Sequence, residues 1–328
     1  MAADFPTLVL VPGAWHQASC YSKIAKLLQE KHGLRCVSVT LPTTGGDPAA
    51  TFKDDLDAAR AAIAGETSQG HDVVVVAHSY GGIVGNSAVK GFTRPKDGGG
   101  QTLAPATPAS PANKEGHVVG TILIASGCNL AGMSFMDPFF GIPPPAWRVN
   151  KETGFAELVV SPRDFFYHDV PDDEAAYWVS QLRPQSLRGL FEGAEHTHAG
   201  WLDVPVWYIG TIEDRGLPVA AQRMGIGMAR EMGANIEHRE LKTSHSPFLS
   251  QPEKTVDIML EAVEAFSGRE MHTAPAEGRT SRDLSVVPEP RLLQPLTWLK
   301  FGLPLLFGRF MGRSILIFRG IRSFFNKA

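Results

Sequence analysis

The stretch that decides the fold is VVVVAHSYGG, residues 73–82. Four consecutive valines predict a strand that is buried on both faces, as in the parallel sheet of an α/β protein. The strand runs into Ser79, and the apolar spacing that follows predicts a helix. A serine on such a sharp strand-to-helix turn forms a nucleophile elbow, with Ala77 and Gly81 as the small neighbours that the turn needs. We therefore expect Ser79 to be a nucleophile; a serine that only caps the helix is the alternative.

Composition narrows the class of protein. The chain has 328 residues, 43% hydrophobic and 20% charged, which is enough to bury a sizeable core. Its net charge of −3 argues against nucleic acid as the main partner. The three cysteines form no spaced framework, and the N-terminus lacks the features of a signal peptide. We therefore expect a cytoplasmic protein without a metal site.

Strands and helices are predicted to alternate around the elbow. Apolar runs predict strands at 7–11, 34–39, 118–125, 204–210 and 236–241, and helical spacing predicts a helix at 51–64. This alternation is typical of an α/β fold, with a mostly parallel sheet flanked by helices. Two segments interrupt it. Residues 94–114, rich in Gly and Pro, predict a flexible insertion, and residues 127–200, rich in aromatics, predict a cap over the site.

Two more polar residues follow predicted strands. Asp214 comes after the strand at 204–210, and His245 comes after the strand at 236–241. Ser, Asp and His in this chain order are what an α/β-hydrolase uses as nucleophile, orienting acid and base. Glu213 competes with Asp214 for the acidic position.

These motifs resemble the α/β-hydrolase branch that holds plant methyl esterases and hydroxynitrile lyases. The matching segments are Pro12–His16, Ala77–Gly82, Thr211–Asp214 and Ser244–Phe248, within a resemblance that covers roughly residues 5–268. The resemblance implies an α/β-hydrolase fold, with the cap inserted after the sixth strand, in a domain at 1–268. It also implies Ser79, Asp214 and His245 as the catalytic set. Pro12 and Ala77 depart from the family pattern, which usually has His and Gly there.

Further site residues follow from the resemblance and from the aromatic cap. The backbone N–H groups of Ala14 and Tyr80 are expected to form an oxyanion hole. We expect substrate contacts from four residues: Trp15, His16, Phe135 and Trp147. His196 and His198 are spaced like metal ligands but lack a third partner.

The expected function is hydrolysis of an ester, lactone or thioester of a small apolar molecule through an acyl-enzyme, without a cofactor. A lyase that uses the same residues is one alternative. The lyases that this sequence resembles carry a lysine after the histidine and a threonine in the oxyanion loop, whereas this chain has Ser246 and Gly13. A non-catalytic ligand-binding protein on this fold is the second alternative.

The C-terminal extension, residues 269–328, becomes basic and apolar from about residue 291. Pro295 and Pro304 are expected to break its first part, and a helix is expected from about Leu305. On that helix Arg309, Arg313 and Arg319 gather opposite an aromatic side, which is typical of a helix lying in a membrane interface. We expect a peripheral membrane contact through 291–328. The alternatives are packing on the core, an oligomer contact, and a helix that spans the membrane. A span is costly, because each arginine at mid-membrane costs about 2.5–3.5 kcal/mol.

Overall fold

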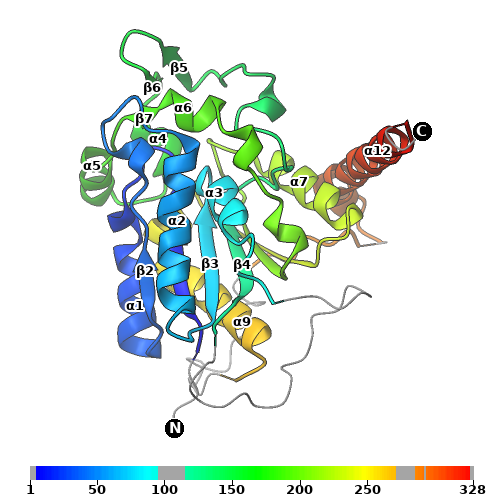
Figure 1. The fold of residues 1–328 in the computed structure, drawn as a ribbon, viewed down its shortest axis with the longest axis horizontal. Coiled ribbons are helices and arrows are strands. Elements are labelled where there is room, and N and C mark those ends of the chain that lie inside the picture. Colours follow the sequence, from blue (N-terminus) through cyan, green and yellow to red (C-terminus); the bar gives the residue numbers. More distant parts are fainter. Residues whose placement is uncertain (1–4, 95–114, 271–284, 292, 326–328) are drawn as a thin grey trace.

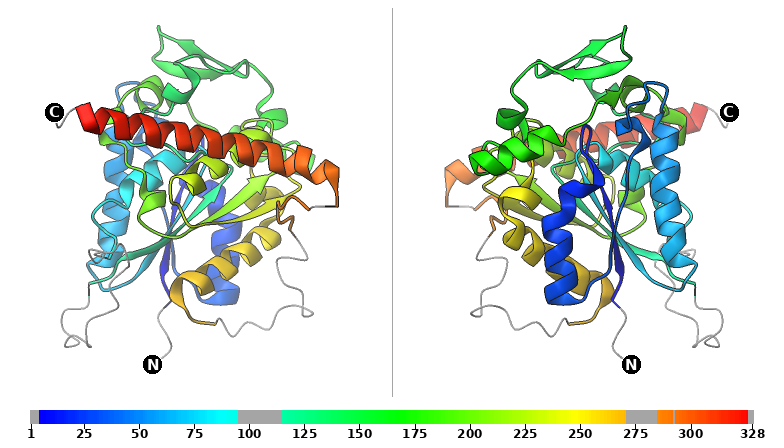
Figure 2. Two further views of the ribbon diagram at one scale, coloured as in Figure 1. Left: turned by 90° about the vertical axis from the view of Figure 1, so that its right-hand side faces the viewer. Right: turned by 90° about the vertical axis from the view of Figure 1, so that its left-hand side faces the viewer.

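The computed structural model of the chain describes residues 5–94, 115–270, 285–291 and 293–325, with the side chains of 322–325 left aside. These residues form three layers, a central sheet with helices on both faces (Figure 1). Helices α2 (Phe52–Thr67) and α3 (Gly81–Ala88) pack together on one face, and α1 (Ser22–His32) and α9 (Pro252–Ser267) pack together on the other (Figure 2). The predicted insertion at 94–114 lies outside the described residues except for Arg94, which pairs with Asp72 at 3.1 Å.

The central sheet has six strands in the order β2-β1-β3-β4-β8-β9, and all neighbours are parallel. The strands are β1 (Thr7–Val11), β2 (Cys36–Ser38), β3 (Val73–His78), β4 (Val118–Ile124), β8 (Val206–Thr211) and β9 (Ile236–Leu241). The four valines of β3 are fully buried between β1 and β4, as the sequence predicts. Strand β2 is shorter than the predicted 34–39, because the N–H of Leu34 bonds to Leu28 at the end of the preceding helix.

Local signals explain where the helices begin and end. The main helices are α1 (Ser22–His32), α2 (Phe52–Thr67), α3 (Gly81–Ala88), α7 (Val219–Glu231), α8 (Pro247–Ser250) and α9 (Pro252–Ser267). Thr51 and Asp54 form a capping box, so α2 begins one residue after the predicted start. Helix α9 begins at Pro252, and Gly268, in the left-handed conformation, caps its C-terminal end.

The cap lies between β4 and β8, above the carboxyl ends of the strands (Figure 1). It contains a three-stranded antiparallel sheet of β5 (Trp147–Asn150), β6 (Phe155–Leu158) and β7 (Gln185–Ser186). Its helices are α4 (Pro162–Phe166), α5 (Asp172–Ser180) and α6 (Leu187–Phe191). The cap follows the fourth strand of this sheet and not a sixth one, because in the described part of the chain only β1 and β2 precede the strand that leads to Ser79.

Short helical turns connect these elements. The 3-10 turns are η1 (Ala18–Tyr21), η2 (Pro42–Thr44), η4 (Asp137–Phe139), η5 (Ala194–His196) and η6 (Gly200–Leu202).

The C-terminal extension first pairs with the sheet and then forms a long helix. Val286 bridges to Glu240 of the edge strand β9 through two main-chain hydrogen bonds of 2.8 Å. The helical part runs through α11 (Pro295–Thr297), the π-helical segment η8 (Trp298–Gly302) and α12 (Leu303–Phe325). The expectation that Pro304 breaks this part is wrong. Proline removes the N–H that would bond to Lys300, and the buried Arg223 donates to that freed Lys300 carbonyl at 2.7 Å instead.

Helix α12 packs along α7 on the outer side of the domain, where Figure 2 shows it crossing one face of the molecule. Glycines make this approach close. A Cβ on Gly308 would lie 2.0 Å from the carbonyl oxygen of Met224, and one on Gly227 would lie 2.2 Å from that of Leu305. Arg313 adds a hydrogen bond of 2.6 Å to Glu231. One side of α12 therefore packs on the core, which is one of the alternatives that the sequence leaves open.

Candidate active site

Ser79 lies at the sharp turn between β3 and α3, as the sequence predicts, and its φ of 51° is in the strained left-handed region. The turn requires Gly81, because a Cβ there would lie 2.3 Å from the carbonyl oxygen of Pro12. The family usually has glycine at position 77, and this chain fits Ala77 there because the residue facing it is Gly85. A Cβ added to Gly85 would lie only 2.9 Å from the Cβ of Ala77.

The structure brings Asp214 and His245 together. His245 Nδ1 donates to Asp214 Oδ2 at 2.7 Å, and both side chains are buried. The Asp214 carboxylate is held from every side: Oδ2 also accepts from the Thr211 hydroxyl at 2.6 Å, and Oδ1 accepts from the main-chain N–H groups of 216 and 217 at 2.7 and 2.8 Å. The competing Glu213 is exposed and pairs with Lys242 at 3.5 Å.

Cap residues hold the loop that carries His245. Asp169 accepts from the Thr243 hydroxyl at 2.7 Å and from the Ser244 N–H at 3.0 Å. The Ser244 hydroxyl donates to the carbonyl of Phe166 in α4 at 2.9 Å. The position of the imidazole therefore depends on the cap as well as on the sheet.

The loop after β1 lies against the elbow. A Cβ on Gly13 would lie 2.9 Å from His78 Nδ1 and 3.0 Å from Ser79 Cβ, so this loop passes Ser79 with no room for a side chain. In the described part of the chain, the N–H groups of Ala14 and Tyr80 have no hydrogen-bond partner, which leaves both free for a ligand oxygen.

A buried carboxylate supports Tyr80, the residue after Ser79. Asp55 in α2 accepts from the Tyr80 hydroxyl at 2.7 Å, and from the N–H and hydroxyl of Thr43 at 2.9 and 2.6 Å. Burial raises the pKa of Asp55 to about 6, against the opposing effect of these hydrogen bonds. The network fixes the orientation of Tyr80, whose N–H is a candidate oxyanion donor.

Two further histidines lie next to His245. His16 Nδ1 donates to the Ala14 carbonyl at 2.7 Å, so its Nε2 accepts from the Tyr167 hydroxyl at 2.8 Å. Burial lowers the pKa of His16 to about 4. His78 Nε2 donates to the His245 carbonyl at 2.9 Å, and burial lowers its pKa well below the usual value. Both rings are therefore neutral near pH 7. His16 is buried with both ring nitrogens hydrogen-bonded, and its contact with substrate stays a prediction.

Of the other predicted substrate contacts, Trp15 and Trp147 are buried and pack edge to face, 6.0 Å between ring centroids. Trp15 also donates from its indole N–H to Ala156 in the cap at 3.0 Å. Phe135 is half-buried and lies edge to face with Tyr80 at 5.4 Å. These aromatics form a wall between the cap and the elbow, and their contact with substrate stays a prediction.

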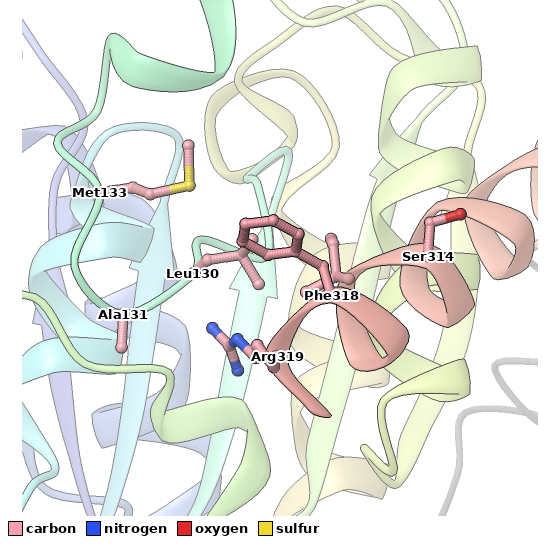
Figure 3. A pocket seen from close by; sticks show the side chains of 7 residues that line it. Leu130, Ala131, Met133, Ser314, Phe318 and Arg319 are labelled. Carbon is pink, nitrogen blue, oxygen red and sulfur yellow. The ribbon is translucent and has the colours of Figure 1, made fainter. Parts of the chain in front are cut away.

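A groove of about 510 Å³ lies beside the cap, away from these residues. One wall comes from the loop after β4, with Leu130 and Met133, and the other comes from α12, with Ile315 and Phe318 (Figure 3). Within the described residues, no cluster of three or more His, Cys, Asp or Glu side chains is placed to hold a metal ion. His198 instead contacts Asp203 at 2.6 Å.

Sequence reasoning missed Asp55, Asp169 and Tyr167. For Asp55 a signal exists, because it falls on the buried stripe of α2 between Phe52 and Ala59, where an acid is out of place. Asp169 and Tyr167 lie in the irregular cap, where no periodicity marks them.

Comparison with known proteins agrees with this architecture. Residues 8–258 match the model of a family described as the alpha/beta hydrolase family. The chain is 28% identical over 260 residues to the alpha/beta hydrolase nvfD of Aspergillus novofumigatus, covering 78% of this chain and 96% of that protein. It is 27% identical, over 78% of this chain and 97% of the other, to a probable hydrolase, R7, of a Phoma species.

Solved structures share the fold. A pyrethroid hydrolase from Sphingobium faniae superposes with a TM-score of 0.57 at 17% identity, covering 80% of this chain and 99% of that one. Polyneuridine aldehyde esterase superposes with a TM-score of 0.59 at 20% identity, covering 79% and 99%. The relatives and the family together support a hydrolase function. Because the family model matches most of the chain, the protein belongs to the alpha/beta hydrolase family.

Proposed function

We propose that this protein is a serine hydrolase that cleaves an ester, lactone or thioester of a small apolar molecule through an acyl-enzyme. The observation that carries the proposal is the hydrogen bond of 2.7 Å from His245 to Asp214, in a loop adjoining the elbow of Ser79. A serine hydroxyl is a weak nucleophile near neutral pH, and a base held in one tautomer overcomes that weakness.

The reaction follows from these positions. His245 Nε2 takes the proton of the Ser79 hydroxyl as its oxygen attacks the acyl carbon. The negative charge that develops on the acyl oxygen is stabilised by the free N–H groups of Ala14 and Tyr80. His245 then protonates the leaving alcohol or thiol. It afterwards takes a proton from the water that attacks the acyl-enzyme, and it returns that proton to the Ser79 oxygen as the acid leaves. Asp214 stabilises the imidazolium in both halves.

The surroundings favour an apolar substrate. Trp15, Trp147 and Phe166 form a run of ring contacts that ends on His245, with centroid distances of about 6 Å at each step. The neutral His16 and His78 add no charge. An acyl group bound beside these rings would be favoured if neutral and penalised if charged, because the rings offer a charge no partner. The pyrethroid hydrolase and the aldehyde esterase of the comparisons carry names that fit this substrate class.

A lyase reaction with the same residues is the main rival. The lyases that the sequence resembles have a lysine after the histidine, whereas Ser246 here is fully buried and supplies no positive charge. A purely ligand-binding protein is the other rival, and it would need neither the strained serine nor the oriented base.

The test is turnover of a panel of short-chain, aromatic and lactone esters. We expect hydrolysis of neutral esters, lost by several orders of magnitude in Ser79→Ala and His245→Ala and kept in Ser68→Ala, an exposed serine in the turn after α2. Release of an aldehyde from a cyanohydrin without ester hydrolysis would establish the lyase instead. Undiminished ester turnover by folded Ser79→Ala protein would exclude the proposal.

A further inference from the structure

The outer side of the C-terminal helix carries a row of exposed apolar side chains, interrupted by one turn at Arg313 and Ser314. Six large side chains on α12 are each about half exposed or more, and we call them the outer face: Leu303, Leu306, Phe307, Phe310, Ile317 and Ile321. They recur at helical spacing, so they share one side of the helix. A row of this length on a monomer's surface marks an interaction site and not an ordinary scatter of exposed apolar residues.

The opposite side of the helix packs against the hydrolase domain. Gly308 and Gly312 lie against the backbone of α7, and an added Cβ at either would come within 2.7 Å of a main-chain carbonyl oxygen. Arg223 donates to the carbonyl of Lys300 and forms a buried bidentate pair with Glu240 at 2.7 Å. The helix therefore cannot turn its outer face inward without losing these contacts.

Charge identifies the kind of surface that the outer face meets. Residues 291–328 carry seven Lys and Arg and no acid. Because the whole chain has a net charge of −3, the remaining 290 residues carry −10. Basic side chains next to the outer face, among them Arg309 and Arg313, are exposed. An apolar face beside basic groups is complementary to a lipid surface with negative headgroups.

We propose that the outer face of α12 binds the protein to an anionic lipid bilayer, with the helix lying in the plane of the interface. Among the described residues, one helix, Pro295–Ile321, is long and apolar enough to cross a membrane. Its most apolar 18 residues have a mean hydropathy of 1.4, and only 22% of them are buried. The packing on α7 selects the interfacial position, because a span would separate the helix from the domain and break the pair between Arg313 and Glu231.

A second copy of the chain fits the outer face less well. A symmetric contact through α12 would bring two basic extensions together, and like charges at close range disfavour it. The outer face continues at Phe318 toward the groove beside the cap, so the same docking would bring the cap near the lipid surface.

The experiment is flotation of the full-length protein with phosphatidylcholine vesicles, with and without phosphatidylserine. We expect the protein to float with the anionic vesicles and to be released as salt screens the charges. The double variant Phe310→Glu/Ile317→Glu should partition about tenfold less for each side chain removed from the bilayer. Arg309→Gln should weaken partitioning by about fivefold, the share of one basic residue near an anionic surface.

The control is Tyr177→Glu, which places one of the two added charges on an aromatic residue of similar exposure in α5, across the molecule from α12 (Figure 1). It should float like the wild type, and so should Ser79→Ala, because binding does not depend on catalysis. The proposal is wrong if the full-length protein stays unbound, or if the double variant floats equally well. It is also wrong if gel filtration shows an oligomer that the double variant dissociates while no vesicle binding occurs, since the outer face is then an interface between copies.

Discussion

Replacing Asp214 by asparagine tests the role of the acid most sharply, because the structure decides which way the new amide will turn. One carboxylate oxygen accepts from the main-chain N–H groups of 216 and 217, which cannot be reversed. The other accepts from the Thr211 hydroxyl, which can rotate, from His245, which can change tautomer, and from the Gln222 side-chain amide at 3.2 Å, the longest of these hydrogen bonds. The asparagine will therefore keep its oxygen on the main chain and point its NH2 group at His245.

This orientation inactivates the base. A donor opposite Nδ1 forces the imidazole proton onto Nε2, the nitrogen that must be free to take the proton of Ser79. In a Ser-His-Asp site this change costs about 10⁴ in kcat, or about 5.4 kcal/mol of transition-state stabilisation. The side chain keeps its size and most of its hydrogen bonds, so we expect a thermal unfolding midpoint close to that of the wild type.

The assay is kcat/KM for a neutral ester, measured beside Glu213→Gln as the control. Glu213 is exposed and adjacent in sequence, so its substitution should leave kcat/KM unchanged within about twofold, which is less than 0.5 kcal/mol. If folded Asp214→Asn protein retains activity within about tenfold of wild type, or if Glu213→Gln causes the loss instead, the assignment of the acid is refuted.

Three further predictions concern the neighbouring elements. Gly13→Ala places a methyl group 3.0 Å from Ser79 Cβ, and it should lower kcat by about 10² by displacing the serine. The control Gly65→Ala has open space around it and should leave kcat unchanged. Equal kinetics for both variants would contradict this prediction. Because the pKa of Asp55 is raised to about 6 in the folded state, its contribution to stability is present below pH 4 and is lost as pH rises through 6. The advantage in unfolding free energy of the wild type over Asp55→Asn should therefore shrink by up to about 3 kcal/mol between pH 4 and pH 7 in urea titrations, and an advantage that grows with pH would show the opposite linkage. Gly308→Ala should separate α12 from α7, lower the melting temperature and expose the extension to protease. In the control Gly320→Ala the new methyl group meets no atom within 4 Å, so this change should stabilise the helix by up to about 1 kcal/mol. Protease resistance of the Gly308→Ala protein would contradict the close packing.

Much of the fold and the site could be predicted because the relevant signals are local. Four valines before Ser79 indicate a buried strand, and the turn residues follow at once in sequence. Asp214 and His245 each come just after a strand, and parallel strands bring such residues to one edge of the sheet, so chain order predicted their proximity.

The features that escaped prediction depend on contacts between distant segments. The link between Asp169 and the loop of His245 joins an irregular cap to the sheet, and no pattern in either segment marks it. In the extension, the sequence placed basic and aromatic residues on opposite sides of a helix but assigned no role to Gly308 and Gly312, because their value appears only when α7 lies against them. Pro304 is expected to break the first part of the extension, yet the helical part runs through it, because Arg223 donates to the carbonyl that proline leaves free.

The central claim is that Ser79 forms a covalent acyl intermediate. The most direct measurement is mass spectrometry of the protein in two experiments: after reaction with a fluorophosphonate probe, and after reaction with an activated ester followed by a rapid quench. The account predicts a single adduct of each kind, mapped by peptide digestion to Ser79, absent in Ser79→Ala and formed far more slowly in His245→Ala. An adduct at another residue, or ester turnover by the wild type with no adduct at Ser79 under any quench, would contradict it.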